Sequence, residues 1–196
     1  MVREYLYEHW ARIGFVSAIF IIALLFFYPG SPLFSVAWLF WLQVPIYMVH
    51  QFEEYVFPGG FEEKLNRVLG SPTLDFPLNA ERAFWINVPL VWFAMTVAAI
   101  IGLRAPIVPA TLIALSIANG VLHVGLAIKQ RHYNPGLIAS IFLNIPLGIF
   151  TLYRLVNEGK LTSLLLIVAI VLGVAIHGLL PIYLNQLMKK DLPLET

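Results

Sequence analysis

Residues 50–54 read His-Gln-Phe-Glu-Glu, so an imidazole precedes two adjacent carboxylates by three and four positions. On a helix these positions share one face, which allows His50, Glu53 and Glu54 to converge on one point. Inverted zinc-protease motifs, His-x-x-Glu-His, use this spacing: the outer pair binds zinc and the inner glutamate is the general base. Glu54 stands where that motif has its second histidine, and it offers an oxygen ligand. The spacing predicts His50 and Glu54 as metal ligands and Glu53 as the catalytic base.

Histidines on later segments supply the other candidate ligands, because a chain without cysteine must hold a metal through His, Glu, Asp or Asn. His123 follows Asn119 by one helical turn and is the first candidate for a third ligand; His177 is the next. Three protein ligands and one water make a catalytic zinc site. We therefore expect zinc, with iron as the alternative. We also expect Asn119 to serve catalysis by orienting His123 or a neighbouring carboxylate.

A plainer interpretation of the motif stays open at this point. Glu54 lies four residues before Pro58, near the end of an apolar run. Charged side chains in such places reach water, or pair with nearby cations, at little cost. His177, taken singly, is typical of a hydrogen-bonded packing histidine. The cations within reach of the glutamates would be Lys64, Arg67 and Arg82.

The elements that position these residues are expected to be membrane helices. Of the 196 residues, 60% are hydrophobic and only 12% are charged, which is about half the charged fraction of soluble domains. Runs long enough to cross about 30 Å of hydrocarbon as helices cover residues 13–29, 34–56, 82–103, 106–128, 136–153 and 161–187. The sequence therefore predicts an all-α fold, a single polytopic membrane bundle of about six transmembrane helices over residues 1–196.

The basic residues orient this bundle, because cytoplasmic loops carry an excess of lysine and arginine. Six spans place both termini on one side. With the termini inside, only Arg104, Arg154 and Lys160 lie outside, and the cytoplasmic cations are Arg3, Arg12, Lys64, Arg67, Arg82, Lys129, Arg131, Lys189 and Lys190. We therefore predict a multi-pass protein with both termini cytoplasmic. The net charge of +1 gives no indication of a nucleic-acid partner.

The longest connection, residues 57–81, contains a helical pattern of its own. Phe61, Leu65, Val68 and Leu69 recur at helical spacing, opposite charged and polar residues. This pattern predicts a short helix near 61–69 that lies on the membrane surface. A solvated connector with an apolar underside is the alternative.

Strongly polar residues within the predicted spans gather at one level. In the six-span topology they come from five helices and fall in the cytoplasmic half: His50, Glu53, Glu54, Asn87, Asn119, His123, Asn144 and His177. Such side chains tend to face the bundle interior. We therefore predict one shared cavity, with Asn87 and Asn144 behind the ligands. Each of these two asparagines also precedes a proline by two positions, where a helix is expected to bend.

The motif and its surroundings resemble a known family. "HQFEEYVFPGGF" (50–61) is similar to the signature of the HXXEE-domain proteins, which are small multi-span membrane proteins, and "NGVLH" (119–123) and "HYNPG" (132–136) also look like that family's pattern. The resemblance covers the middle two-thirds of the chain and implies the signature residues without a reaction. A looser resemblance is to CPBP-type intramembrane proteases, whose pattern expects an arginine where this chain has Pro58.

Several functions fit these residues. The first is a membrane-embedded, metal-dependent hydrolase that acts on a lipid or lipid-borne group at the cytoplasmic leaflet. The second is a metal-independent acid–base enzyme for an isoprenoid-like substrate, because adjacent carboxylates in an apolar site titrate apart. A proton-coupled transporter is the third, although the outer halves of the spans are nearly devoid of polar residues. The fourth is a lipid- or haem-binding protein, with His123 and His177 as haem ligands. The expected partners are membrane lipid and a hydrophobic small molecule.

Overall fold

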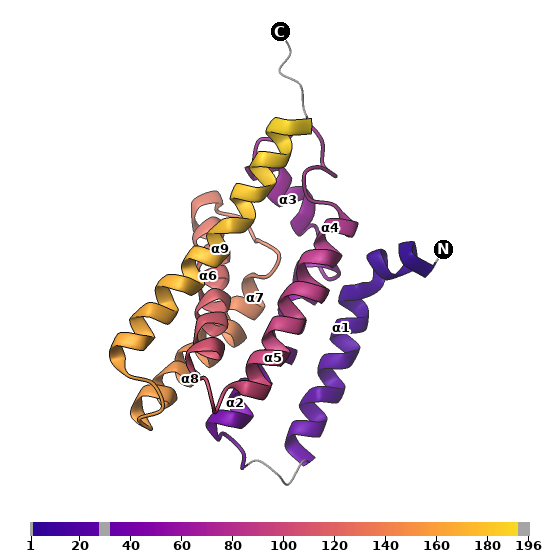
Figure 1. Ribbon diagram of the computed structural model, residues 1–196. Coiled ribbons are helices and arrows are strands. Elements are labelled where there is room, and N and C mark those ends of the chain that lie inside the picture. Colours follow the sequence, from indigo (N-terminus) through magenta and orange to yellow (C-terminus); the bar gives the residue numbers. More distant parts are fainter. Residues whose placement is uncertain (1, 28–31, 192–196) are drawn as a thin grey trace.

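The computed structural model describes residues 2–27 and 32–191, and every regular element in these ranges is a helix (Figure 1). Residues 28 and 29 of the first predicted span lie outside the described part. Two elements, η1 and η2, are π-helical turns inside longer helical runs. The elements are α1 (Val2–Phe27), α2 (Val36–Tyr55), α3 (Phe61–Val68), α4 (Ala80–Trp85), η1 (Ile86–Trp92), α5 (Phe93–Ile101), α6 (Ile107–Gln130), α7 (Leu137–Ala139), η2 (Ser140–Asn144), α8 (Ile145–Asn157) and α9 (Ser163–Asp191).

The predicted polytopic membrane bundle is confirmed. Within the described ranges, five helical runs have the length and apolar composition of membrane spans: Val2–Phe27, Ala80–Ile101, Ile107–Gln130, Leu137–Asn157 and Ser163–Lys190. The remaining predicted span, 34–56, corresponds to α2. This helix has 20 residues, but the polar side chains between Gln43 and Glu54 lower its hydropathy and keep it out of this set.

Helix α2 lies at the centre of the bundle, where protein covers its polar side chains. Fourteen of its 20 residues are buried, and it packs against α1, α3, α5, α6, α7, η2 and α8. Neighbouring helices thus supply the partners that polar groups at membrane depth require. The central position of α2 explains how the most polar of the long helices can carry the HxxEE motif.

Successive long helices run in alternating directions, so α9 ends on the side of the bundle where α1 begins (Figure 1). Helix α2 returns alongside α1, and α9 runs along α6. Six alternating long runs produce this arrangement. Helix α3 and the loop that follows it lie at the end of the bundle where the chain begins and finishes (Figure 1).

Both Asn-x-Pro segments coincide with π-helical turns. Pro89 lies inside η1, and Pro146 follows the end of η2 by two residues. Proline lacks an N–H and its ring clashes with the carbonyl four residues earlier, so a wider turn relieves the local conflict. Asn87 and Asn144 belong to these turns and are buried. The wide turns therefore aim an amide inward from each of two membrane spans.

Helix α3 is the short amphipathic helix predicted near residues 61–69, with two differences. Phe61, Leu65 and Leu69 pack into an apolar cluster that includes Leu78, as predicted, but Val68 lies outside this cluster and is 48% exposed. Asn66, which the pattern places on the polar face, is completely buried. Its side chain donates to the carbonyls of Leu74 (2.8 Å) and Leu78 (2.7 Å) and accepts from the N–H of Leu78 (2.9 Å). Asn66 thus fastens the following loop onto α3.

Candidate metal centre

His50 and Glu54 of α2 meet His123 of α6 in the interior of the bundle. Oε1 of Glu54 lies 3.3 Å from Nε2 of His50 and 3.0 Å from Nε2 of His123. All three side chains are buried, and one ligand atom from each lies within 4.8 Å of the others. Ligand atoms around a tetrahedral zinc ion, with bonds of about 2.0 Å, are separated by about 3.3 Å. The spacing of the three donors therefore fits a single metal ion.

Two ring nitrogens of this cluster are buried and unsatisfied. Nδ1 of His50 has no hydrogen-bond partner among the described residues, and Nε2 of His123 faces Glu54 without the geometry of a hydrogen bond. Buried polar atoms are nearly always paired, so such exceptions point to a missing ligand or to a chemical role. A metal bound between Glu54 and the imidazoles would satisfy Nε2 of His123 directly.

Asn134 holds the ring of His123 from the other side. Its side-chain nitrogen lies 3.1 Å from Nδ1 of His123 and 3.4 Å from the carbonyl of the same residue. Because the amide nitrogen donates, Nδ1 of His123 is the acceptor in this contact, which fixes the orientation of the ring. Asn119, which was expected to orient His123 or a neighbouring carboxylate, contacts His50 instead, and Asn134 was not among the predicted site residues. The Asn-Pro-Gly turn at 134–136 was the sequence feature that could have identified Asn134.

Gly136 makes room for both imidazoles. A Cβ atom at this position would lie 2.8 Å from Cε1 of His50 and 2.8 Å from Cε1 of His123, and the backbone has φ +93°. The close contact and the left-handed backbone both make any larger residue at this position energetically costly. The loop between α6 and α7 therefore forms one wall of the histidine cluster.

Glu53 points to a different target from its neighbour Glu54. Its Oε1 accepts a bond from the N–H of Ile138 (2.9 Å) and another from the hydroxyl of Tyr133, and its Oε2 accepts from the N–H of Ala139 (2.6 Å). A carboxylate so placed caps the helical run that begins at Leu137. Partial burial raises the pKa of Tyr133 and the bond to Glu53 raises it further, so this phenol stays protonated and donates. Glu53 is not part of the three-residue cluster.

Asn119 connects the cluster to His177. Its side-chain nitrogen lies 2.8 Å from Nε2 of His50, and its oxygen lies 3.0 Å from Nε2 of His177 on α9. Of the predicted site residues, His50, Glu54 and His123 thus form the cluster, while Asn119 and His177 extend from it as a hydrogen-bonded chain. The predicted roles of Asn119 and Glu53 in catalysis, and of His177 as a ligand, stay predictions.

Asn87 and Gln51 form a buried hydrogen-bonded pair outside the three-residue cluster. Gln51 donates to Asn87 at 2.6 Å and also accepts from Nε1 of Trp92. Gln51 is one of the unspecified positions of the HxxEE motif, and nothing in the motif selects it. Both side-chain polar atoms of Asn144 are buried without a hydrogen-bond partner among the described residues.

Comparison with known proteins identifies one family. The family model described as "Protein of unknown function with HXXEE motif" matches residues 41–151, which is more than half of the chain. This range contains His50, Glu53, Glu54, Asn119, His123 and the Asn134–Gly136 turn. No curated protein and no solved structure matches. The looser resemblance to CPBP-type proteases is not confirmed.

Proposed function

The chain belongs to the HXXEE family, and we propose that it is a membrane-embedded, metal-dependent hydrolase that acts on a lipid or a lipid-borne group. His50, Glu54 and His123 would hold the metal, with zinc as the expected ion and iron as the alternative. The observation that carries the proposal is the buried carboxylate of Glu54 at 3.0 and 3.3 Å from two imidazoles. Two histidines and one glutamate are also the ligands of hydrolytic zinc sites.

Three protein ligands would leave one position for water, and a zinc ion held there would act as a Lewis acid that lowers the pKa of that water. Hydrolysis of an ester or amide adds the oxygen of water to the acyl carbon and gives a proton to the leaving oxygen or nitrogen. We propose that His177 and Asn119 are positioning residues, because Nε2 of His177 donates to Asn119 and Asn119 contacts His50. We propose that Glu53 acts as a positioning residue through its cap on the run from Leu137.

A neighbouring cavity supports a hydrophobic substrate. It has a volume of about 440 Å³, and most of its walls are aliphatic or aromatic side chains from η1, α6 and α9. Its polar side chains include Tyr47, Asn87, Asn119, His177 and Tyr183. Apolar cavities of this size with few polar groups are typical ligand sites. An apolar molecule in this cavity would contact Asn119, which in turn contacts His50.

Elemental analysis tests the metal directly. The full chain, purified in detergent without chelator, is expected to contain about one zinc per chain, and His50→Ala is expected to contain none. The control is His132→Ala, because His132 is exposed in the loop after α6 and outside the cluster. A wild-type protein without zinc or iron, indistinguishable from His50→Ala, would contradict the proposal.

A metal-free acid–base enzyme is the second candidate, and one contact favours it. The amide of Asn119 already lies 2.8 Å from Nε2 of His50, the nitrogen that would bind the metal. Without a metal, that contact fixes the His50 ring and leaves its buried Nδ1 as the nitrogen for acid–base chemistry. The same elemental analysis separates the two candidates.

We further propose that both ends of the chain, together with α3, lie in the cytoplasm. The distribution of lysine and arginine supports this orientation, because only Arg104, Arg154 and Lys160 lie on the opposite side and the other nine lie on the side of the termini. On the opposite side, Glu158 pairs with Arg154 at 2.7 Å and with Lys160 at 2.9 Å. The hydrogen bonds from Lys160 and Arg154 lower the pKa of Glu158.

Cysteine labelling tests this orientation, and the chain has no native cysteine to interfere. Asn157→Cys, at the exposed end of α8, is expected to react with a membrane-impermeant maleimide on intact cells. Thr73→Cys, in the exposed loop after α3, is expected to react only after permeabilisation. The reverse pattern would invert the topology and place the metal centre near the opposite leaflet.

A further inference from the structure

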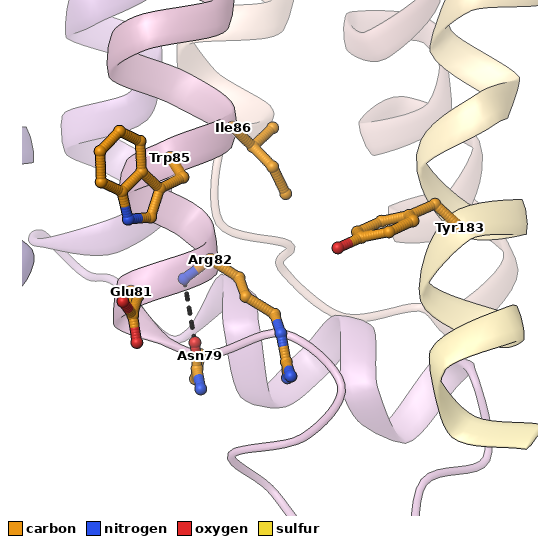
Figure 2. A pocket seen from close by; sticks show the side chains of 6 residues that line it. All are labelled: Asn79, Glu81, Arg82, Trp85, Ile86 and Tyr183. Carbon is orange, nitrogen blue, oxygen red and sulfur yellow. Dashed lines mark hydrogen bonds between the residues drawn. The ribbon is translucent and has the colours of Figure 1, made fainter. Parts of the chain in front are cut away.

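Two adjoining cavities form a groove between the run α4–η1 and helix α9. The outer cavity has about 340 Å³ and the inner cavity about 440 Å³. Trp85, Ile86 and Tyr183 line both cavities, which therefore meet at these residues. Figure 2 shows the outer cavity: Tyr183 extends from α9 toward α4, and Arg82 lies on the opposite side. We call the two cavities together the α4–α9 groove.

The outer end of the groove is cationic. Arg82 donates to the carbonyl of Pro77 at 2.7 Å and stacks on Phe76, and no described carboxylate lies at ion-pair distance from it. The carboxylate of Glu81 in the same cavity is paired with Arg3 at 2.6 Å. One positive charge is thus left without a counter-ion. A guanidinium held in place, with donors still free, suits a carboxylate or phosphate.

The inner end of the groove reaches Asn119 and His177, which are linked to His50 by hydrogen bonds. Beyond Tyr183 the walls are mainly aliphatic and include Leu90, Leu179 and Leu180. Asn119 and His177 close the groove, and Asn119 contacts His50 at 2.8 Å. His177 precedes Tyr183 by six residues, which is about 9 Å along a helix. A molecule that extends from the cationic mouth to His177 must therefore be apolar for most of its length.

We propose that the α4–α9 groove binds a single-chain lipid with an anionic head group, carboxylate or phosphate, whose head lies at Arg82 and whose chain runs inward toward His177. That this lipid is also the substrate rests on the function proposed above. In that case the bond to be cleaved lies inside the molecule, away from the charged head. The groove has one cationic mouth and one largely apolar inner part, which match one head and one chain.

Photo-crosslinking to the full-length protein in detergent tests the occupant. The probe is a long-chain fatty acid with a diazirine in its chain, and the comparison probe is the alcohol of the same length. The fatty acid is expected to label peptides from η1 and from residues 176–183 of α9. Arg82→Gln is expected to reduce this labelling about tenfold, the effect of losing a charge-assisted hydrogen bond. Leu179→Trp is expected to block labelling by filling the groove, since Leu179 is 59% exposed and the fold does not depend on it.

The matched control is Arg67→Gln, because Arg67 lies on α3 at the same end of the bundle but outside the groove. It is expected to leave labelling unchanged. A single-chain alkyl phosphate should compete with the probe, whereas inorganic phosphate should not; displacement by inorganic phosphate would mean that the mouth binds free anions and not a lipid. Equal labelling by the alcohol, or labelling spread evenly over α1 and α9, would overturn the proposal in favour of ordinary bilayer contact.

Labelling requires neither metal nor turnover, so its failure is distinct from failure of the proposed hydrolase. His50→Ala is expected to keep full labelling, because His50 does not line the groove. A protein that binds the probe but contains no metal would retain the lipid site and lose the proposed reaction. A protein that contains zinc but is not labelled would support the proposed metal site and rule out the lipid site.

Discussion

Glu54→Gln is expected to abolish metal binding, whereas Glu53→Gln is expected to leave the metal in place. Glutamine keeps the size of either side chain and removes its charge. At position 54 this change removes the carboxylate that lies between His50 and His123, at 3.3 and 3.0 Å. Loss of an orienting neighbour alone lowers metal affinity by about 10- to 100-fold, so loss of a charged ligand should exceed about 100-fold.

Glu53→Gln should instead lower stability. Its two oxygens receive the N–H groups of Ile138 and Ala139, and the amide of glutamine would direct its own N–H₂ toward one of them. Replacing a charged cap in this way costs about 1–2 kcal/mol of unfolding free energy. Metal titration by calorimetry and thermal unfolding of both variants measure the two effects. Tyr133→Phe is the control, because it removes one bond to Glu53 and touches no ligand.

The opposite result has a definite meaning. If Glu53→Gln lost the metal and Glu54→Gln kept it, the roles of the adjacent glutamates would be exchanged relative to the observed contacts. If both variants and His50→Ala kept the same metal content, the cluster would not be the metal site, and the acid–base candidate would take precedence.

Gly136→Ala is the second substitution with a large expected effect. The new Cβ would lie 2.8 Å from Cε1 of both His50 and His123, closer than van der Waals contact allows. Because this glycine has φ +93°, alanine also carries backbone strain of about 1–3 kcal/mol. We expect a lower melting temperature and a loss of metal affinity of at least about tenfold, since ligand geometry must be held within about 0.5 Å.

Gly70→Ala separates the two contributions. Gly70 also has a positive φ, +77°, but a Cβ there would meet nothing within 4 Å. It therefore carries the backbone strain without displacing the imidazoles. Lower stability in both variants, with lower metal affinity in Gly136→Ala alone, is the expected result. Equal metal affinity in both variants would show that the turn does not set the position of the histidines.

The sequence alone determined the class of fold and part of the site. Apolar runs of membrane-crossing length predicted the helical bundle, because hydrocarbon accepts a backbone only when its hydrogen bonds are satisfied internally. Helical spacing placed His50 and Glu54 one turn apart, and the common level of polar residues selected His123. These inferences depend on helical geometry and on the energetic cost of polar groups in lipid. The order of the residues along the chain is enough to evaluate each of them.

The tertiary structure decided what each of these side chains contacts. Glu53 and Glu54 lie about 60° and 40° to either side of His50 around the helix, so the motif permits both to face one centre. Packing separates them, because α6 presents His123 to Glu54 and the start of α7 presents free N–H groups to Glu53. The central position of α2 and the close approach of Gly136 to His50 depend on segments far apart in the chain, and the contact of Asn134 with His123 closes a turn of 11 residues. No local periodicity encodes these placements.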